Sequence, residues 1–128
     1  MKEGFMTIRK TLLLTIAIVG MLTTPLLAFE GGTYQDFSES AYQEASNFRR
    51  VLYFYASWCS TCQASDKKLT QINIPKDAVI FRVNYDTANE LKAKYGIQYQ
   101  DTFVQVDKDS AAVNVWHGQV DMLAKNLK

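Results

Sequence analysis

Two cysteines separated by two residues, Cys59 and Cys62, constrain the fold of this chain more than any other feature. They are its only cysteines, and they closely follow the apolar and aromatic run from Val51 to Ala56. An uninterrupted run of this kind is typical of a strand buried on both faces. The residues from about Cys59 to Thr70 are helix-like, so we expect the pair where a buried strand turns into a helix.

This position gives the two sulfurs different chemistry. A cysteine at the first turn of a helix lies near unpaired N–H groups and the positive end of the helix dipole, which favour its thiolate. Cys62, one turn further on, is placed to attack a mixed disulfide formed by Cys59. The pattern therefore favours thiol–disulfide exchange.

Two structural interpretations of the cysteine pair are weaker. A zinc site needs about four ligands, and the pair with the single histidine, His117, does not supply them. A purely structural disulfide between such close neighbours closes a small loop, which stabilises a fold little.

The first 28 residues have the pattern of an export signal. Three basic side chains precede an apolar segment at residues 12–19, and the small Ala28 suits the last position before a cleavage point. We expect residues 1–28 to be a signal peptide, with an uncleaved N-terminal membrane anchor as the alternative. Either outcome places the folded part outside the cytoplasm, periplasmic or secreted, or held at a membrane. Residues 29–33 read as a linker.

Charge and size exclude some classes of function. Removing residues 1–28 takes away three of the 14 basic and one of the 13 acidic side chains, which leaves a formal charge of −1. This balance gives no field that would gather nucleic acid or anionic lipid. The remaining residues can bury one modest core without several disulfides. The two cysteines are therefore expected to serve the function of the protein and not only its stability.

Apolar spacing and capping residues predict the other elements. We expect Asp36 to cap the first helix, Thr87 and Glu90 to form a capping pair at the third, and Gly96 to end the third. The expected order is a helix over 37–47, a strand over 51–56, a helix over 59–70, a strand over 78–83, a helix over 87–95, a hairpin of strands over 102–107 and 111–116, and a last helix over 120–127. This order predicts an α/β fold, with a central mixed β-sheet flanked by helices on both faces.

The chain resembles the thioredoxin superfamily, and the segment FYASWCSTC is most similar to its extracytoplasmic bacterial members. The resemblance covers about residues 34–128, which we expect to be one thioredoxin-like domain. It extends to VNYD at residues 83–86, KYGI at residues 94–97 and Gly118.

The resemblance implies a role for each residue of the motif. Cys59 would be the exposed attacking thiol, Cys62 the resolving thiol, and Trp58 would flank the site and cover part of it. No cofactor is implied, because the two thiols carry the electrons. The implied partners are protein thiols or disulfides and an upstream thiol–disulfide donor, with no nucleic acid, and the expected state is a monomer.

Three positions depart from the family pattern. Asp101 precedes Thr102 where members carry a cis-proline that faces the cysteines. Tyr53 stands where a buried acid often helps to deprotonate the resolving thiol, and a tyrosine with a reference pKa of about 10 is a poor base. Arg82 replaces a lysine that often accompanies that acid, so we expect it to pair elsewhere or to reach the surface.

Asp101 is the departure with the clearest electrostatic consequence. In the family position its carboxylate would lie near both sulfurs, where two charges ~4 Å apart at an effective dielectric of about 20 repel by roughly 4 kcal/mol. Because a helix terminus contributes only about 0.3–1 kcal/mol, we expect a disfavoured Cys59 thiolate or a protonated Asp101. A cysteine pair with a disfavoured thiolate is expected to reduce or isomerise the disulfides of its partners. The alternative is that Asp101 turns away and caps a turn. The Gln100–Asp101 peptide should be trans.

Two other classes of function remain open. In a metal-handling module, the two thiolates, aided by Asp101, would hold a soft ion such as Cu(I). In a redox-inert interaction domain, the cysteines would persist only as a bridge.

Overall fold

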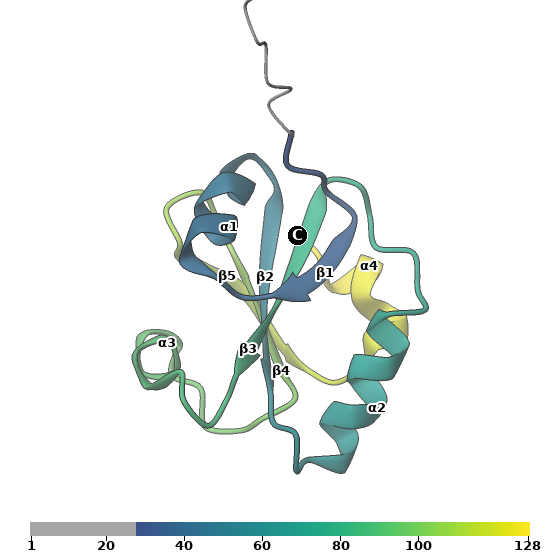
Figure 1. Cartoon of the computed structure of the whole chain (residues 1–128), viewed down its shortest axis with the longest axis vertical. Helices are drawn as coiled ribbons and strands as arrows, with labels where there is room; N and C mark the ends of the chain where they lie inside the picture. Colours follow the sequence, from purple (N-terminus) through teal and green to yellow (C-terminus); the bar gives the residue numbers. More distant parts are fainter. Residues whose placement is uncertain (1–27) are drawn as a thin grey trace, which may run out of the picture.

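The computed structural model describes residues 28–128 (Figure 1). The predicted leader, residues 1–28, therefore lies outside the described residues except for Ala28. No helix in the described part is long and apolar enough to cross a membrane. In chain order the elements are β1 (Thr33–Asp36), α1 (Glu39–Glu44), the 3-10 turn η1 (Ala45–Asn47), β2 (Arg49–Tyr55), α2 (Ser60–Leu69), β3 (Ala78–Asn84), α3 (Asn89–Tyr95), β4 (Thr102–Val106), β5 (Ala112–His117), the 3-10 turn η2 (Val120–Met122) and α4 (Leu123–Asn126).

The strands form one mixed sheet in the order β1-β3-β2-β4-β5. Strands β1 and β2 pair in parallel with β3, whereas β4 is antiparallel to both β2 and β5. Figure 1 shows α1 and α3 on one side of this sheet and α2 and α4 on the other. The predicted fold class, a central mixed sheet with helices on both faces, is confirmed.

The central strand β2 holds the two halves of the core together. Val51 and Tyr53 pack in the cluster on the α2 and α4 side, whereas Leu52 and Phe54 pack in the cluster on the α1 and α3 side. All four side chains are fully buried, as the uninterrupted apolar run predicted. Burying one large apolar side chain contributes about 1.5–3 kcal/mol, so β2 anchors both faces.

The edge strand β1 was not predicted. Its residues are mostly half-buried and carry no long apolar run, and the strand exists because it pairs with β3 from Thr33 to Asp36. The helix that follows is also shorter than predicted, and its N-cap is Ser38 rather than Asp36. The Ser38 hydroxyl accepts a hydrogen bond from the Ala41 N–H at 3.2 Å, while Asp36 pairs with Arg82 on β3.

The third helix begins at Asn89, two residues later than predicted. The prediction of a capping pair formed by Thr87 and Glu90 is wrong, because Ala88 is the N-cap and makes no side-chain hydrogen bond to the helix. The predicted end is confirmed: Gly96 adopts the left-handed conformation, with φ of 64°. Glycine has no Cβ, so it enters this region without the steric cost that other residues meet.

The C-terminal segment packs against the sheet. The side chains of Val120, Leu123 and Leu127 are buried together with those of β2. The segment is a 3-10 turn followed by one short helix, where a single helix was expected. The side-chain amide of Gln105 on β4 makes hydrogen bonds with both the N–H and the C=O of Lys128, which fixes the segment to the sheet.

A buried arginine connects α1 with the β4–β5 hairpin. The guanidinium of Arg50 is only 1% exposed. It donates to the carbonyl oxygens of Tyr42, Asp107 and Lys108 at 3.2, 2.8 and 3.2 Å. Its central carbon also lies 4.1 Å from the centre of the Tyr42 ring, a cation–π contact.

Candidate redox site

Cys59 is the N-cap of α2, at the turn that leaves β2, as the sequence predicted. Its Sγ accepts a hydrogen bond from the Cys62 N–H at 3.2 Å and lies 3.2 Å from the Thr61 hydroxyl. Burial raises the pKa of Cys59, but hydrogen bonds from the Cys62 side chain, the Thr61 hydroxyl and the Cys62 N–H outweigh it, and the pKa falls below its ordinary value. The helix terminus therefore favours a Cys59 thiolate.

Cys62 lies beneath Cys59 and has the opposite tendency. Its side chain is fully buried, and burial together with the hydrogen bond to Cys59 raises the pKa of Cys62 to about 12. Both cysteines are free thiols in this structure. The description of Cys59 as exposed is wrong, since it is 6% exposed against 0% for Cys62, yet it is the more accessible sulfur.

Trp58 lies beside the cysteines with 61% of its surface exposed. Its indole N–H points between the two carboxylate oxygens of Asp86, at 3.1 Å from each. The exposed ring thus has a fixed orientation next to Cys59, which agrees with the flanking position expected for it.

Asp101 is held by its backbone at the end of the sheet next to the cysteines. Its N–H donates to the Phe54 carbonyl and its own carbonyl accepts from the Gly118 N–H, both at 2.9 Å. Its φ of 59° is in the left-handed region, which Asp tolerates better than most residues. Residues 28–128 contain no cis peptide bond, so the Gln100–Asp101 bond is trans, as expected.

The electrostatic expectation for Asp101 needs a correction. Its charge does raise the pKa of both cysteines, but on Cys59 it acts more weakly than the hydrogen bonds to the sulfur. The hydrogen bonds to the Cys59 sulfur prevail, so the thiolate is favoured rather than disfavoured. The sequence-based comparison counted the helix terminus and omitted the hydrogen bonds from the Cys62 side chain and the Thr61 hydroxyl.

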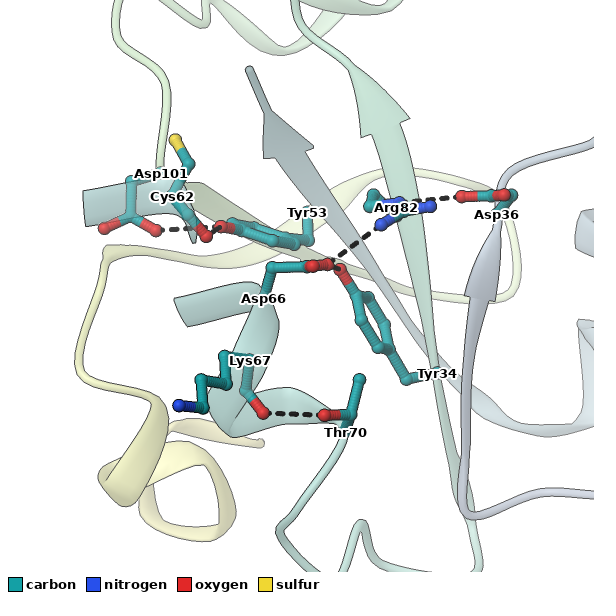
Figure 2. Close-up of polar contacts among 9 residues, drawn as sticks. All are labelled: Tyr34, Asp36, Tyr53, Cys62, Asp66, Lys67, Thr70, Arg82 and Asp101. Carbon is teal, nitrogen blue, oxygen red and sulfur yellow. Dashed lines mark hydrogen bonds and ion pairs between the residues drawn. The ribbon is translucent and has the colours of Figure 1, made fainter. Parts of the chain in front are cut away.

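Tyr53 connects Asp101 with the second cysteine (Figure 2). The buried Tyr53 hydroxyl lies 3.1 Å from the Cys62 carbonyl oxygen and 3.1 Å from Asp101 Oδ1, so its single proton has two acceptors within reach. Burial, followed by the negative charge of Asp101, raises the pKa of Tyr53. The hydroxyl therefore keeps its proton, and Tyr53 acts as a donor rather than as a base.

The Arg82 side chain pairs elsewhere, which confirms that expectation. It contacts Asp36 at 2.7 Å and Asp66 on α2 at 3.0 Å. Asp66 also accepts a hydrogen bond from the Tyr34 hydroxyl, as Figure 2 shows. This cluster ties the edge strand β1 and strand β3 to the helix that carries the cysteines.

Thr102 completes the turn that follows Asp101. Its buried hydroxyl donates to the Tyr99 carbonyl at 2.7 Å and lies 2.8 Å from Nδ1 of His117. Because the single hydroxyl proton is used on Tyr99, the ring nitrogen of His117 is the donor to Thr102. The exposed rings of Tyr99 and His117 meet edge to face at this end of the sheet.

Sequence reasoning placed the cysteines, Trp58 and Asp101 at one site, and the structure brings them together. It missed the hydroxyl of Thr61 and the bridging hydroxyl of Tyr53. The role of Thr61 could have been predicted, because its hydroxyl lies within the C-x-x-C motif itself. The contact between Tyr53 and Asp101 could not, because it depends on the pairing of β2 with β4. Within residues 28–128, no group of three or more His, Cys, Asp or Glu side chains is arranged to hold a metal ion.

Comparison with known proteins agrees with this fold and site. The family model described as Thioredoxin matches residues 32–128. Thioredoxin-1 of Caenorhabditis elegans is 31% identical over 72 residues, which are 56% of this chain and 62% of that protein. The C. elegans protein named "Probable thioredoxin-2" is 30% identical over 95 residues, 73% of this chain and 63% of that protein. The matches thus span less than two thirds of either relative.

Solved structures show the same fold at lower identity. Trxlp from Edwardsiella tarda EIB202 superposes with a TM-score of 0.63 at 19% identity, covering 75% of this chain and all of that chain. A thioredoxin from Malassezia sympodialis has a TM-score of 0.61 at 18% identity, covering 75% and 89%. A mixed sheet flanked by helices, with a C-x-x-C motif at the N-terminus of the second helix, defines a class of proteins that react through two thiols. By the extent of the family match, this chain belongs to the thioredoxin family.

Proposed function

We propose that this protein exchanges disulfides with partner proteins through Cys59 and Cys62, on the reducing or isomerising side. Cys59 attacks a partner disulfide, a mixed disulfide forms, and Cys62 then attacks Cys59 and releases the reduced partner. The observation that carries the proposal is the contrast between the two sulfurs. Cys59 at the helix terminus has a lowered pKa, and the buried Cys62 has a raised one.

Whether the protein reduces or oxidises its partners depends on how stable the reduced, dithiol form of Cys59 and Cys62 is. A strong oxidant owes its potential to a highly stabilised thiolate. Here the lowered pKa of Cys59 works in that direction, but the charge of Asp101 opposes it and the dipeptide Ser60-Thr61 carries no cation. Cys62 stays protonated at neutral pH. We expect a midpoint potential nearer to about −270 mV, as in thioredoxin, than to about −120 mV, as in strongly oxidising members.

Trapping tests the exchange reaction directly. The Cys62→Ser variant should retain partners as mixed disulfides through Cys59, to be identified by mass after non-reducing separation. The Cys59→Ser variant is the matched control and should retain far less. Trapping by Cys59→Ser with none by Cys62→Ser would reverse the two roles. Equilibration of the wild type with glutathione buffers of known ratio then tests the direction.

We also propose an extracytoplasmic location, supported by the sequence pattern of residues 1–28 alone. The mature protein should begin near Phe29 and be recovered from the periplasm or the medium. N-terminal sequencing of each cell fraction tests this. A start at Met1 or Met6 in the cytoplasm would contradict it, and the same start in the membrane fraction would indicate an uncleaved anchor.

A further inference from the structure

A groove of about 1080 Å³ opens at the edge of the sheet, next to the turn that carries the cysteines. It exists because β1 ends at Asp36, opposite Arg82, whereas β3 continues to Asn84. The residues that begin α1 and α3 complete its walls. Ligand pockets in proteins commonly measure about 300–1,000 Å³, so this groove has room for a short polypeptide segment.

The groove is continuous with the redox site. Tyr55 lines it and also packs against the buried cluster that contains Cys59 and Cys62. Ser57, two residues before Cys59, lines it as well. When a partner is joined to Cys59 through a mixed disulfide, the partner residues near its reacting cysteine are therefore within reach of the groove.

Carboxylates outnumber cations around the groove. Four carboxylates line it against two cations: Asp36, Glu39, Asp86 and Glu90 against Arg82 and Lys94. Arg82 is already engaged by Asp36 and, from outside the groove, by Asp66. The N-terminal ends of α1 and α3 each add at most about half a positive charge, which cancels only one of the two excess negative charges. The groove therefore favours a cationic occupant.

The less exposed residues of the groove suit the stem of a long basic side chain. They include Phe37, Val83 and Leu91, which pack against the core, whereas Glu39 and Glu90 are exposed. Lysine and arginine cover apolar surface with their aliphatic stems and keep their charged heads at the outside. The lining thus matches these two residue types in both its apolar and its charged part.

We propose that this groove holds a basic segment of the partner polypeptide, close to the partner cysteine that reacts with Cys59. The inference rests on the proposed function and adds the class of partner, namely proteins whose disulfide is flanked by lysine or arginine. Residues 55–63, which include both cysteines, carry no charged side chain that opposes this preference. The carboxylate of Asp101, on the other side of the cysteines, acts in the same sense.

Two synthetic peptides of equal length, each with one internal disulfide, test the preference. Lysines flank the cysteines in one peptide and glutamates in the other, and each rate is divided by that of 2-mercaptoethanol with the same peptide. The reduced wild type should favour the lysine peptide about tenfold, the lower end of the range for charge-steered association. The preference should shrink in 1 M salt, where the screening length is about 3 Å. Equal rates, or faster reduction of the glutamate peptide, would overturn the inference.

Removal of two carboxylates tests whether the preference belongs to the groove. The double variant Glu39→Gln with Glu90→Gln should lose most of it. Glu44→Gln with Asp109→Asn is the matched control, because it removes the same charge from exposed positions that do not line the groove. The control should keep the preference of the wild type, and the unfolding midpoints of both variants check that they fold. The same preference in the two double variants would overturn the inference.

A trapped complex locates the basic segment without relying on rates. Single-cysteine versions of both peptides are activated with thionitrobenzoate, which Cys59 of the Cys62→Ser variant displaces as it forms the mixed disulfide. Amide signals around Glu39 and Glu90 should shift with the lysine peptide and not with the glutamate peptide. Equal signals in the two complexes would overturn the inference and leave the proposed function intact. If the wild type reduces neither peptide and no mixed disulfide forms, the proposed function is overturned and this inference with it.

Discussion

Asp66 on α2 forms an ion pair with Arg82 on β3, at 3.0 Å, directly below the helix turn that carries the cysteines. Asp66 lies four residues after Cys62, and its carboxylate, with 25% of the side chain exposed, accepts a hydrogen bond from the Tyr34 hydroxyl. The Asp66 carboxylate thus joins helix α2 to strands β1 and β3 through Tyr34 and Arg82.

Replacing Asp66 should therefore destabilise the fold. Asp66→Asn removes the charge that holds both Arg82 and Tyr34, and we expect a loss of about 1–3 kcal/mol in the free energy of unfolding. Asp36→Asn is the matched control, since Asp36 contacts the same arginine from an exposed position, where a pair contributes about 0–1 kcal/mol. Urea unfolding of both variants measures the difference. Equal losses would contradict a special role for Asp66.

Alkylation should separate the two thiols. At pH 7 iodoacetamide should modify Cys59 and leave Cys62 untouched, because Cys62 is fully buried and its pKa is about 12. The rate at Cys59 should rise with pH and level off below 9.0, the ordinary value from which its pKa is lowered. Peptide mapping after timed quenching identifies the modified residue. Modification of Cys62 at a similar rate in the folded protein would refute the assignment.

The Thr61 hydroxyl should contribute to the lowered pKa of Cys59. Thr61→Val keeps the shape of the side chain and removes the hydrogen bond at 3.2 Å, so the Cys59 pKa should rise. Ser60→Ala, which alters the exposed neighbour in the same dipeptide, should have a smaller effect. Thiolate absorbance near 240 nm, followed against pH, gives both values. A larger rise in Ser60→Ala would show that a different hydroxyl supports the thiolate.

The charge of Asp101 should act on Cys59 in the opposite sense. Because a negative neighbour raises the pKa of the thiol, Asp101→Asn should lower the Cys59 pKa in the same titration. Asp109→Asn provides the charge control away from the site. No change, or a rise, would mean that the carboxylate does not act on the sulfur.

Gly31 should tolerate substitution less well than Gly96. A Cβ at Gly31 would lie 2.0 Å from the Lys76 carbonyl oxygen and 2.5 Å from the Phe48 ring, so the backbone must move. We expect Gly31→Ala to cost about 1–3 kcal/mol. Gly96→Ala meets no atom within 4 Å and carries only the strain of its φ of 64°, about 1 kcal/mol. A smaller loss in Gly31→Ala than in Gly96→Ala, by thermal unfolding, would contradict this packing.

The parts of the fold that sequence reasoning predicted are those with a local cause. The apolar run of β2 and the cysteine pair each carry their own signal, and Cys59 is the N-cap as expected. The edge strand β1 has no such signal, because it depends on a register with β3 that lies more than 40 residues away.

The N-cap of α1, predicted at Asp36 and found at Ser38, likewise depends on a contact from a distant part of the chain. Both Asp36 and Ser38 are good N-cap residues. The choice between them depends on Arg82, which engages Asp36 from the neighbouring strand and leaves Ser38 to cap α1. The balance at Cys59 likewise depended on a hydrogen-bond geometry that residue spacing alone does not give.

The guanidinium of Arg50 has a consequence for how this domain opens. Its hydrogen bonds end on carbonyl oxygens of α1 and of the β4–β5 turn, and no carboxylate is among them. If either segment separated, a buried cation would lose its partners, which is costly in a medium of low polarity. Helix α1 and the hairpin should therefore open together as one cooperative unit, and their slowest-exchanging amide hydrogens should share a single opening free energy.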